Sequence, residues 1–452
     1  MAGNARKTAL SVLNTLDKGR RTLDSVLDDV LGRDPSFSSR DKGLIYALVY
    51  GVLRWRGNLD WIIGHFSKTP LNRIDPGVLN VLRIGLFQIK FLSRIPVSAA
   101  INTSVEMTKS FAAPWVVGYV NATLRSAAKG YQTVPFPELS EDPVIAIASK
   151  KSFPKWLIAR WVNRPGIEET LALCDAINTI PPITIRTNSL KSSRKKLIKS
   201  LESDVEHIEK TNYSSTGISF SNPKRPISEI KAFEEGWFQV QDEAAQLVTL
   251  FLNPQPGETV LDACAGLGGK TGHIAQMMEN HGRLVAMDKD DKKLRRLEVE
   301  MHRLGVSTVS ILPHDLNHPL SGNRVEMFDR ILLDAPCSGL GVLRRNPDTK
   351  WSMSKKKLSY HKEKQARFMK NLAHLVKPSG VLVYAVCSTE PEENTAVVKD
   401  FLNKHSEFAI EKGGMGLPAK ANHLIDQDGF LRTFPHLHNM DGFFSVCLKR
   451  IK

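Results

Sequence analysis

The sequence predicts a multidomain protein in which an all-α bundle is followed by a small α+β module and then by an α/β domain. Three observations predict this fold class. Apolar residues recur every three or four positions through residues 1–130, as they do on one face of a helix. A stretch rich in proline, serine and acids at 131–143 has no such period and is expected to be a linker. Strand and helix patterns then alternate through a module at 144–235 and a domain at 236–452, and in this last domain they indicate a parallel sheet.

The composition indicates a globular cytoplasmic protein. A chain of 452 residues with 42% hydrophobic content can bury two or three cores. Its first residues lack the apolar core of a signal peptide, and no apolar run reaches the roughly 18 residues that a membrane helix needs, so no membrane partner is expected. The five cysteines are an odd number without the spacing of a zinc site, so neither disulfides nor a metal are expected. They are Cys174, Cys264, Cys337, Cys387 and Cys447.

The charge distribution suggests an anionic partner such as RNA. The formal net charge is +15, and residues 1–130 hold 18 lysines and arginines against 9 acids. A second basic cluster at 344–370 holds 10 lysines and arginines against 2 acids. The basic helical part can be interpreted in two ways, as an RNA-binding domain or as a docking module with a solvated surface.

Local signals predict several elements in the first two parts. Asp75 precedes a proline, which is the pattern of a helix N-cap with proline at the first helical position. Residues 153–178 have a helical pattern, and 183–187 alternate apolar and polar residues as a strand does. An amphipathic helix opened by a serine cap is expected at 192–203, and a strand at 217–220. This order predicts a small α+β module.

The first half of the last domain predicts a nucleoside-cofactor site. Its strands are expected at 259–263, 284–287 and 309–312. A glycine-rich loop, Cys264–Gly272, follows the first strand, and Asp288 and Asp315 follow the next two. Cys264 stands where a triphosphate-binding loop needs glycine, and Thr271 stands where a dinucleotide fingerprint needs glycine. An acid about twenty residues after a glycine loop is typical of a carboxylate that binds a ribose hydroxyl. Ordinary turns are the alternative.

Two cysteines follow two further predicted strands. The apolar run 331–333 ends at Asp334 and is followed by a proline and Cys337, and a second run, 380–386, ends at Cys387. Because parallel strands present their carboxyl ends at one edge of the sheet, both thiols and Asp334 are expected at the same crevice. The alternative is that each cysteine is a small buried apolar residue.

These motifs resemble those of the Sun/RsmB family of S-adenosylmethionine-dependent ribosomal RNA cytosine-5 methyltransferases, and the resemblance extends over nearly the whole chain. The motifs that carry it are CAGLGGKT at 264–271, DAPCSG at 334–339, RRNPDTKW at 344–351, YAVCSTEPEEN at 384–394 and DGFF at 441–444. The resemblance implies a NusB-like domain at the N-terminus and a Rossmann-like methyltransferase domain at the C-terminus.

The resemblance also implies roles for individual residues. Cys387 would be the nucleophile, Cys337 the second cysteine that serves release, and Asp334 a further catalytic residue. S-adenosyl-L-methionine would be held by Cys264, Ala265, Gly266, Leu267, Gly268, Gly269, Lys270, Asp288, Asp315 and Asp334. The sequence departs from the family at two places, since Gly266 and Leu267 stand where Ala-Pro is usual and Val386 where threonine usually precedes the nucleophile.

The chemistry of cytosine explains why the family needs these groups. Carbon 5 is a poor nucleophile, so a thiolate first adds to carbon 6 and makes carbon 5 able to attack a methyl group. An acid near ring nitrogen 3, here Asp334, would stabilise the adduct. Positive charge from 344–350 or a helix terminus is expected to lower the pKa of the thiol. The base must be unpaired or flipped, with the basic segment at 344–370 holding flanking phosphates.

The function implied by the resemblance is methylation of a cytosine in small-subunit (16S) ribosomal RNA through a covalent cysteine–cytosine intermediate. Two alternatives stay open: a tRNA cytosine-5 methyltransferase, and a non-catalytic NusB-like RNA-binding or antitermination protein. Methylation of a small molecule is disfavoured by the basic clusters and the additional domains. Neither the target nucleotide nor an oligomeric state follows from the sequence.

Overall fold

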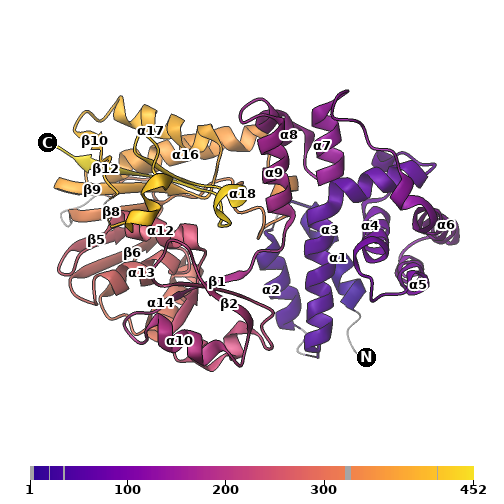
Figure 1. Cartoon of the computed structure of the whole chain (residues 1–452), viewed down its shortest axis with the longest axis horizontal. Coiled ribbons are helices and arrows are strands. Elements are labelled where there is room, and N and C mark those ends of the chain that lie inside the picture. The colour runs from indigo at the N-terminus through magenta and orange to yellow at the C-terminus, as the bar shows by residue number, and fades with distance from the viewer. Residues whose placement is uncertain (1–4, 20, 34–35, 321–326, 415) are drawn as a thin grey trace. The chain divides into compact units, whose positions relative to one another are not determined.

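The computed structural model describes residues 5–19, 21–33, 36–320, 327–414 and 416–452 (Figure 1). The chain forms two compact units, each described separately below. Unit 1 comprises residues 1–179 together with the short segment 343–352, and unit 2 comprises 180–342 and 353–452. Segment 343–352 therefore belongs to a unit whose other residues lie more than 160 positions earlier in the chain.

The regular elements that the structure describes in unit 1 are all helices, as predicted for residues 1–130. The N-cap at Asp75 is confirmed, because its carboxylate accepts hydrogen bonds from the backbone N–H groups of Gly77 and Val78 at 2.9 and 3.1 Å. Ser38 and Asp41 form a capping box at the start of the longest helix. The helices that correspond to the predicted bundle are α1 (Ala5–Asp17), α2 (Leu23–Arg33), α3 (Ser39–Phe66), α4 (Pro76–Phe91), α5 (Val97–Lys109) and α6 (Pro114–Gly130). Their apolar faces form one buried core.

Four further α-helices of unit 1 are described, namely α7 (Pro143–Lys151), α8 (Lys155–Val162), α9 (Ile167–Asn178) and, in segment 343–352, α15 (Thr349–Ser352). The sequence placed residues 144–179 in the module at 144–235, whereas here they belong to the same compact unit as the N-terminal helices. The helical pattern at 153–178 is confirmed, with a break between α8 and α9. The boundaries proposed from the sequence for the helical bundle, the α+β module and the α/β domain stay a prediction.

Segment 343–352 contains the whole of the basic motif RRNPDTKW, and two of its cationic side chains, Arg344 and Lys350, are buried in unit 1. Lys350 is 0% exposed. Its ammonium donates a hydrogen bond to Asn178 Oδ1 at 2.7 Å and lies 3.6 Å from the centre of the Phe153 ring. Arg344 is 2% exposed. The expectation that these two residues hold RNA phosphates is therefore wrong, because a buried cation cannot reach a solvated anion. Burial raises the pKa of the Cys174 thiol in unit 1, and the charge of Lys350 opposes that rise. The expected effect of residues 344–350 on Cys387 stays a prediction.

The same segment is joined to α3 by hydrogen bonds from side chains to backbone carbonyl oxygens. Arg54 donates to the carbonyl oxygen of Arg344 at 2.8 Å, and the Trp351 indole N–H donates to the carbonyl oxygen of Leu53 at 2.6 Å. Trp351 also packs at the edge of the unit 1 core. Since each contact joins residues about 290–300 positions apart, no local sequence pattern predicts it.

Unit 2 begins with the predicted α+β module. Its antiparallel sheet has the order β2-β3-β1-β4, formed by β1 (Ile183–Thr187), β2 (Glu206–Lys210), β3 (Gly217–Ser221) and β4 (Phe238–Val240). The expected strands at 183–187 and 217–220 are confirmed. The expected helix is α10 (Arg194–Leu201), and the Ser193 hydroxyl caps it by accepting the N–H of Lys196.

The larger sheet of unit 2 has the order β10-β12-β9-β8-β5-β6-β7, with β11 paired to β12. The parallel strands are β5 (Thr259–Asp262), β6 (Arg283–Asp288), β7 (Val309–Pro313), β8 (Phe328–Asp334) and β9 (Val376–Val386). The antiparallel strands are β10 (Phe408–Ile410), β11 (Phe430–Thr433) and β12 (Phe443–Arg450). The sheet is therefore mixed, and the sequence predicted only its parallel part.

Helices cover both faces of this sheet (Figure 1). On one face pack α16 (Lys355–Ala373) and α17 (Thr395–Leu402). On the other pack α12 (Glu243–Leu252), α13 (Gly269–Met277) and α14 (Asp291–Leu304). Burial on both faces explains why the strands read as continuous apolar runs. Among the described residues, no helix is long and apolar enough to cross a membrane.

Candidate active site

The glycine-rich loop joins β5 to α13 at the carboxyl edge of the sheet. Gly266 and Gly268 have φ angles of 57° and 85°, in the left-handed region that favours glycine. A Cβ atom on Gly268 would lie 2.8 Å from the Met301 side chain, so the close packing of the loop on α14 also requires glycine. Leu267, between them, is 47% exposed. The two glycines therefore give the loop its left-handed turns on either side of the exposed Leu267 side chain.

Arg186, on β1 of the small sheet, forms hydrogen bonds that stabilise this loop. The sequence analysis did not predict this role. Its guanidinium is 0% exposed and donates to the carbonyl oxygen of Gly269 at 2.8 Å and to Gln239 Oε1 at 2.8 Å. Burial lowers its pKa to about 9, so it still carries its charge at neutral pH. The arginine lies in a strand whose apolar and polar residues alternate. The only sequence signal for its role is that a charged residue stands in this strand.

Asp288 ends β6 beside the glycine loop, as predicted. One carboxylate oxygen accepts the N–H of Gly266 at 3.0 Å, and the other accepts the N–H of Asp290 at 2.9 Å. The loop and the acid are thus fixed to each other. Cys264, at the start of the loop, is half-buried, and burial followed by the charge of Asp288 raises the pKa of its thiol well above the usual value. Cys264 is therefore a neutral thiol at physiological pH.

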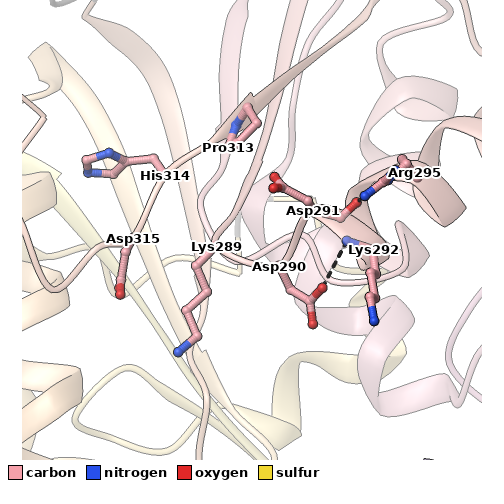
Figure 2. Close-up of a pocket in the computed structure, with 8 residues that line it drawn as sticks. All are labelled: Lys289, Asp290, Asp291, Lys292, Arg295, Pro313, His314 and Asp315. Carbon is pink, nitrogen blue, oxygen red and sulfur yellow. Dashed lines mark hydrogen bonds between the residues drawn. The ribbon is translucent and has the colours of Figure 1, made fainter.

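Asp315 lies across an open pocket of about 820 Å³ from the residues that follow Asp288. Figure 2 shows Asp315 and His314 on one side, the Asp290–Arg295 segment on the other and Lys289 between them. A hydrogen bond from the backbone N–H of Asn317 at 3.0 Å lowers the pKa of Asp315. The carboxylate is therefore ionised and available to donors of a ligand.

Lys270 and Asp334 form an ion pair at the junction of the loop and β8. The ammonium lies 2.5 Å from the Asp334 carboxylate and 5.3 Å from the centre of the Phe443 ring. Burial acts to lower the pKa of Lys270, but the charge and hydrogen bond of Asp334, together with the charge of Cys387, outweigh it, and the pKa is raised. The ammonium of Lys270 thus interacts electrostatically with Cys387 as well as with Asp334.

The two predicted thiols meet at the ends of adjacent parallel strands. The Sγ atoms of Cys337 and Cys387 are 3.3 Å apart, within hydrogen-bond distance and well beyond the roughly 2.05 Å of a disulfide. The register of β8 and β9 pairs Asp334 with Ala385, which brings the two following loops together. The hydrogen bond with Cys387, burial and the charges of Cys387 and Glu393 raise the pKa of Cys337 well above its usual value. Cys337 is therefore a protonated thiol at neutral pH.

These residues fit S-adenosyl-L-methionine. Carboxylates at two successive strand ends suit the hydroxyl and amino groups of a nucleoside, and the glycine loop offers backbone N–H groups at close range. Asp288, Asp315 and the loop at 264–270 would hold the cofactor, with Asp334 at the side that faces the thiols. Among the described residues, no group of three or more His, Cys, Asp or Glu side chains is placed to hold a metal ion.

Three family models match the chain. The model described as 16S rRNA methyltransferase RsmB/F matches residues 249–449, the NusB family model matches 3–129, and a ferredoxin-like domain of RsmF/B-like methyltransferases matches 153–227. The third match includes α8 and α9, so it begins earlier than the small sheet.

The similarity to curated proteins extends over the full length. The chain is 34% identical to the probable ribosomal RNA small subunit methyltransferase B of Synechocystis over 99% of both chains. The probable enzyme of the same name from Bacillus subtilis is also 34% identical over 99% of both chains.

Two solved structures are also similar to this chain in fold and sequence. The structure of PH0851 has a TM-score of 0.80 and 26% identity over 99% of both chains. NSun6 from Pyrococcus horikoshii, solved with the S-adenosylmethionine analogue SFG, has a TM-score of 0.57 and 25% identity, and the match covers 67% of this chain and 99% of that one.

The fold and the loop define an S-adenosylmethionine-dependent methyltransferase with a NusB-like helical domain. The sequence identity over the full length then identifies the family: the chain belongs to the RsmB/F family of 16S rRNA methyltransferases. It is accordingly an rRNA methyltransferase. The resemblance found in the sequence is confirmed at this level.

Proposed function

We propose that the protein methylates carbon 5 of a cytosine in 16S ribosomal RNA and that Cys387 forms a covalent bond with the base. The observation that carries this proposal is the 3.3 Å separation of the two sulfur atoms beside the ion pair of Lys270 and Asp334. The names of the relatives support the small-subunit RNA as the substrate, and the NusB-like domain agrees with an RNA partner.

The chemistry begins at Cys387. Its thiolate, which interacts favourably with the Lys270 ammonium, adds to carbon 6, and the displaced electron pair moves toward ring nitrogen 3. Asp334 is 30% exposed on its side chain, so it can contact the base while it holds Lys270. S-adenosyl-L-methionine supplies the methyl group that carbon 5 takes.

Release requires two bonds to break. Carbon 5 loses its proton to water, the electrons of that bond restore the double bond between carbons 5 and 6, and the bond from carbon 6 to sulfur breaks with its electron pair on Cys387. Cys337 is a thiol at neutral pH, so it acts as a hydrogen-bond donor to the departing sulfur rather than as a base.

The site in the RNA can be tested by bisulfite sequencing of 16S rRNA from cells with and without the gene. One protected cytosine should be lost on deletion, regained with the wild-type protein and not regained with Cys387→Ala. Unchanged 16S rRNA together with a lost cytosine in tRNA would establish the tRNA alternative.

The roles of the two thiols can be separated in vitro. Cys387→Ala should abolish methylation, because no bond to carbon 6 forms, while the protein still binds RNA and cofactor. Cys337→Ala should transfer the methyl group and then stall, so that a protein–RNA adduct survives denaturing electrophoresis. The double variant should give no adduct. An adduct with Cys387→Ala alone would reverse the two roles.

A further inference from the structure

Glu393 is a buried carboxylate between the two cysteine loops, and the reaction above leaves it without a role. It ends the short 3-10 helix η4 (Pro391–Glu393), which follows β9 and the loop of Cys387. Its side chain is 0% exposed. A buried carboxylate is costly unless donors surround it, so its partners show what it does.

The partners of Glu393 come from both cysteine loops. Oε1 accepts the backbone N–H of Ser338 at 2.8 Å, and Oε2 accepts the hydroxyls of Ser338 and Ser388, each at 2.5 Å. Ser338 directly follows Cys337, and Ser388 directly follows Cys387. One carboxylate therefore bonds to the residue after each thiol.

A third element joins the same carboxylate. Gln365, on α16, donates to Glu393 Oε1 at 3.2 Å and to the carbonyl oxygen of Pro336 at 3.1 Å. Cys337 is thus held on both sides, through Pro336 before it and Ser338 after it. The carbonyl oxygen of Glu393 accepts the Tyr384 hydroxyl at 2.5 Å, which fixes Glu393 to β9.

The two thiols differ in the number of other contacts that fix their position in the fold. Cys387 directly follows β9, which pairs with β8 on one side and with β12 on the other up to Val386. Cys337 lies three residues beyond the last residue of β8, Asp334, in a loop without regular secondary structure. Loss of the Glu393 contacts should therefore displace Cys337 more than Cys387.

We propose that Glu393 is a positioning residue of the methyl-transfer reaction, which holds the loops of Cys337 and Cys387 together and so sets the distance between the two sulfur atoms. The proposal rests on the covalent mechanism proposed above. It explains why a carboxylate is present: every described neighbour of its two oxygens is a hydrogen-bond donor, and its charge opposes ionisation of Cys337.

The positional part is tested with Glu393→Asp, which keeps the charge but is one methylene too short to reach both loops. The variant should release product about 100-fold more slowly, as expected for a misplaced group, with unchanged binding affinity for RNA and for the cofactor. A protein–RNA adduct should accumulate as it does with Cys337→Ala. Glu392→Asp, at the neighbouring half-buried acid, is the matched control and should turn over like the wild type.

The electrostatic part is tested with Glu393→Gln in a Cys387→Ala background. The amide keeps the shape and one acceptor oxygen but removes the charge, so the Cys337 thiol should ionise at lower pH. Alkylation of Cys337 by iodoacetamide, mapped by mass spectrometry from pH 7 to 10, should become about tenfold faster on the rising part of the profile, which corresponds to one pH unit. Glu392→Gln should leave the profile in place.

The outcomes separate this proposal from the proposed function. Normal turnover of Glu393→Asp, or slow turnover without an adduct while Cys337→Ala still traps one, would overturn the positioning role alone. If Cys337→Ala traps no adduct either, the covalent mechanism fails and the positional role fails with it. An unshifted alkylation profile in Glu393→Gln would overturn the electrostatic role whatever the reaction is. Circular dichroism and cofactor binding verify that each variant is folded.

Discussion

Two lysines, the fully buried Lys350 of unit 1 and the half-buried Lys270 of unit 2, show how differently the same side chain can be used. Lys350 in unit 1 and Lys270 in unit 2 both belong to motifs that carry the family resemblance. Among the contacts described, Lys350 bonds only to neutral oxygens and to the face of Phe153, and burial lowers its pKa well below the usual value. Lys270 faces Asp334, and its pKa is raised.

Burial acts to lower the pKa of both lysines, and the carboxylate partner of Lys270 is what reverses the direction of its shift. A cation surrounded by neutral acceptors is penalised in its charged form, whereas a carboxylate neighbour reverses the sign of the shift. We interpret Lys350 as a structural residue that joins segment 343–352 to the helices of unit 1. Lys270 is a charge positioned at the candidate active site.

The largest expected effect is that of Lys270→Met. It removes the ammonium that interacts with both Asp334 and Cys387, so single-turnover methylation should fall by about 10²–10³-fold, the range typical of a lost electrostatic stabiliser. The rate is measured by transfer of a labelled methyl group to 16S rRNA. A rate within twofold of the wild type would remove the functional distinction between the two lysines.

Lys350→Met should act on stability instead. It leaves the acceptors on Asn178, Arg54 and Ser152 without their donor, and we expect unfolding of unit 1 to become easier by about 2–3 kcal/mol. Urea denaturation followed by tryptophan fluorescence measures this. Methylation by the folded protein should be unchanged, and a strong loss of RNA affinity would instead favour a phosphate-binding role.

The pH dependence sharpens the comparison further. The pKa of Lys350 is lower in the folded than in the unfolded chain, so between these two values the unfolded chain binds more protons and stability rises with pH. The stabilising contribution is complete above the ordinary lysine pKa and is lost as the pH falls toward the folded value. The wild type should gain up to about 1.4 kcal/mol per pH unit relative to Lys350→Met as the pH approaches 10. Parallel stability curves would contradict the assignment.

Asp288→Ala is expected to weaken cofactor binding in unit 2, with an effect between those of the two lysine variants and that of the last variant below. It removes a carboxylate that orders the glycine loop and is placed for a cofactor hydroxyl. The affinity for S-adenosyl-L-methionine should fall by about 1.5–3 kcal/mol, tenfold or more. Calorimetry measures it, and unchanged affinity in a folded protein would exclude Asp288 from the cofactor site.

The smallest effect is expected for Trp351→Phe in unit 1. The substitution keeps an aromatic ring but removes the indole N–H that donates to the carbonyl oxygen of Leu53. Unfolding should become easier by about 1 kcal/mol, with methylation unchanged. A deletion of residues 1–130 would be a poorer test of this unit, because it would also uncover Lys350 and Trp351.

Much of unit 2 was predictable because its chemistry follows local patterns. Apolar runs that end in Asp288, Asp334 and Cys387 mark strand ends by themselves, since a doubly covered strand needs apolar residues at every position. Parallel strands then bring those ends to one edge. The pairing of the two thiols was therefore expected before their 3.3 Å separation was measured.

Other features depended on contacts between residues distant in the sequence. The basic residues Arg344 and Lys350 read as a surface cluster, yet they are buried in unit 1, because burial is decided by what packs around a segment and not by its charge. Arg186 and Glu393 are single polar positions whose partners lie up to 90 residues away, so no spacing rule identifies them.

The sequence by itself determined the family, the order of the parallel strands along the chain and the residues at their ends, because each depends on short-range periodicity or on a contiguous motif. Only the tertiary structure decided that segment 343–352 belongs with the N-terminal helices, that β12 pairs antiparallel with β9, and that Glu393 lies between the two cysteine loops. Each of these depends on contacts between residues far apart in the sequence. A buried polar group needs a hydrogen-bond partner, and the tertiary fold decides which distant residue supplies it, so no local sequence pattern predicts the pairing.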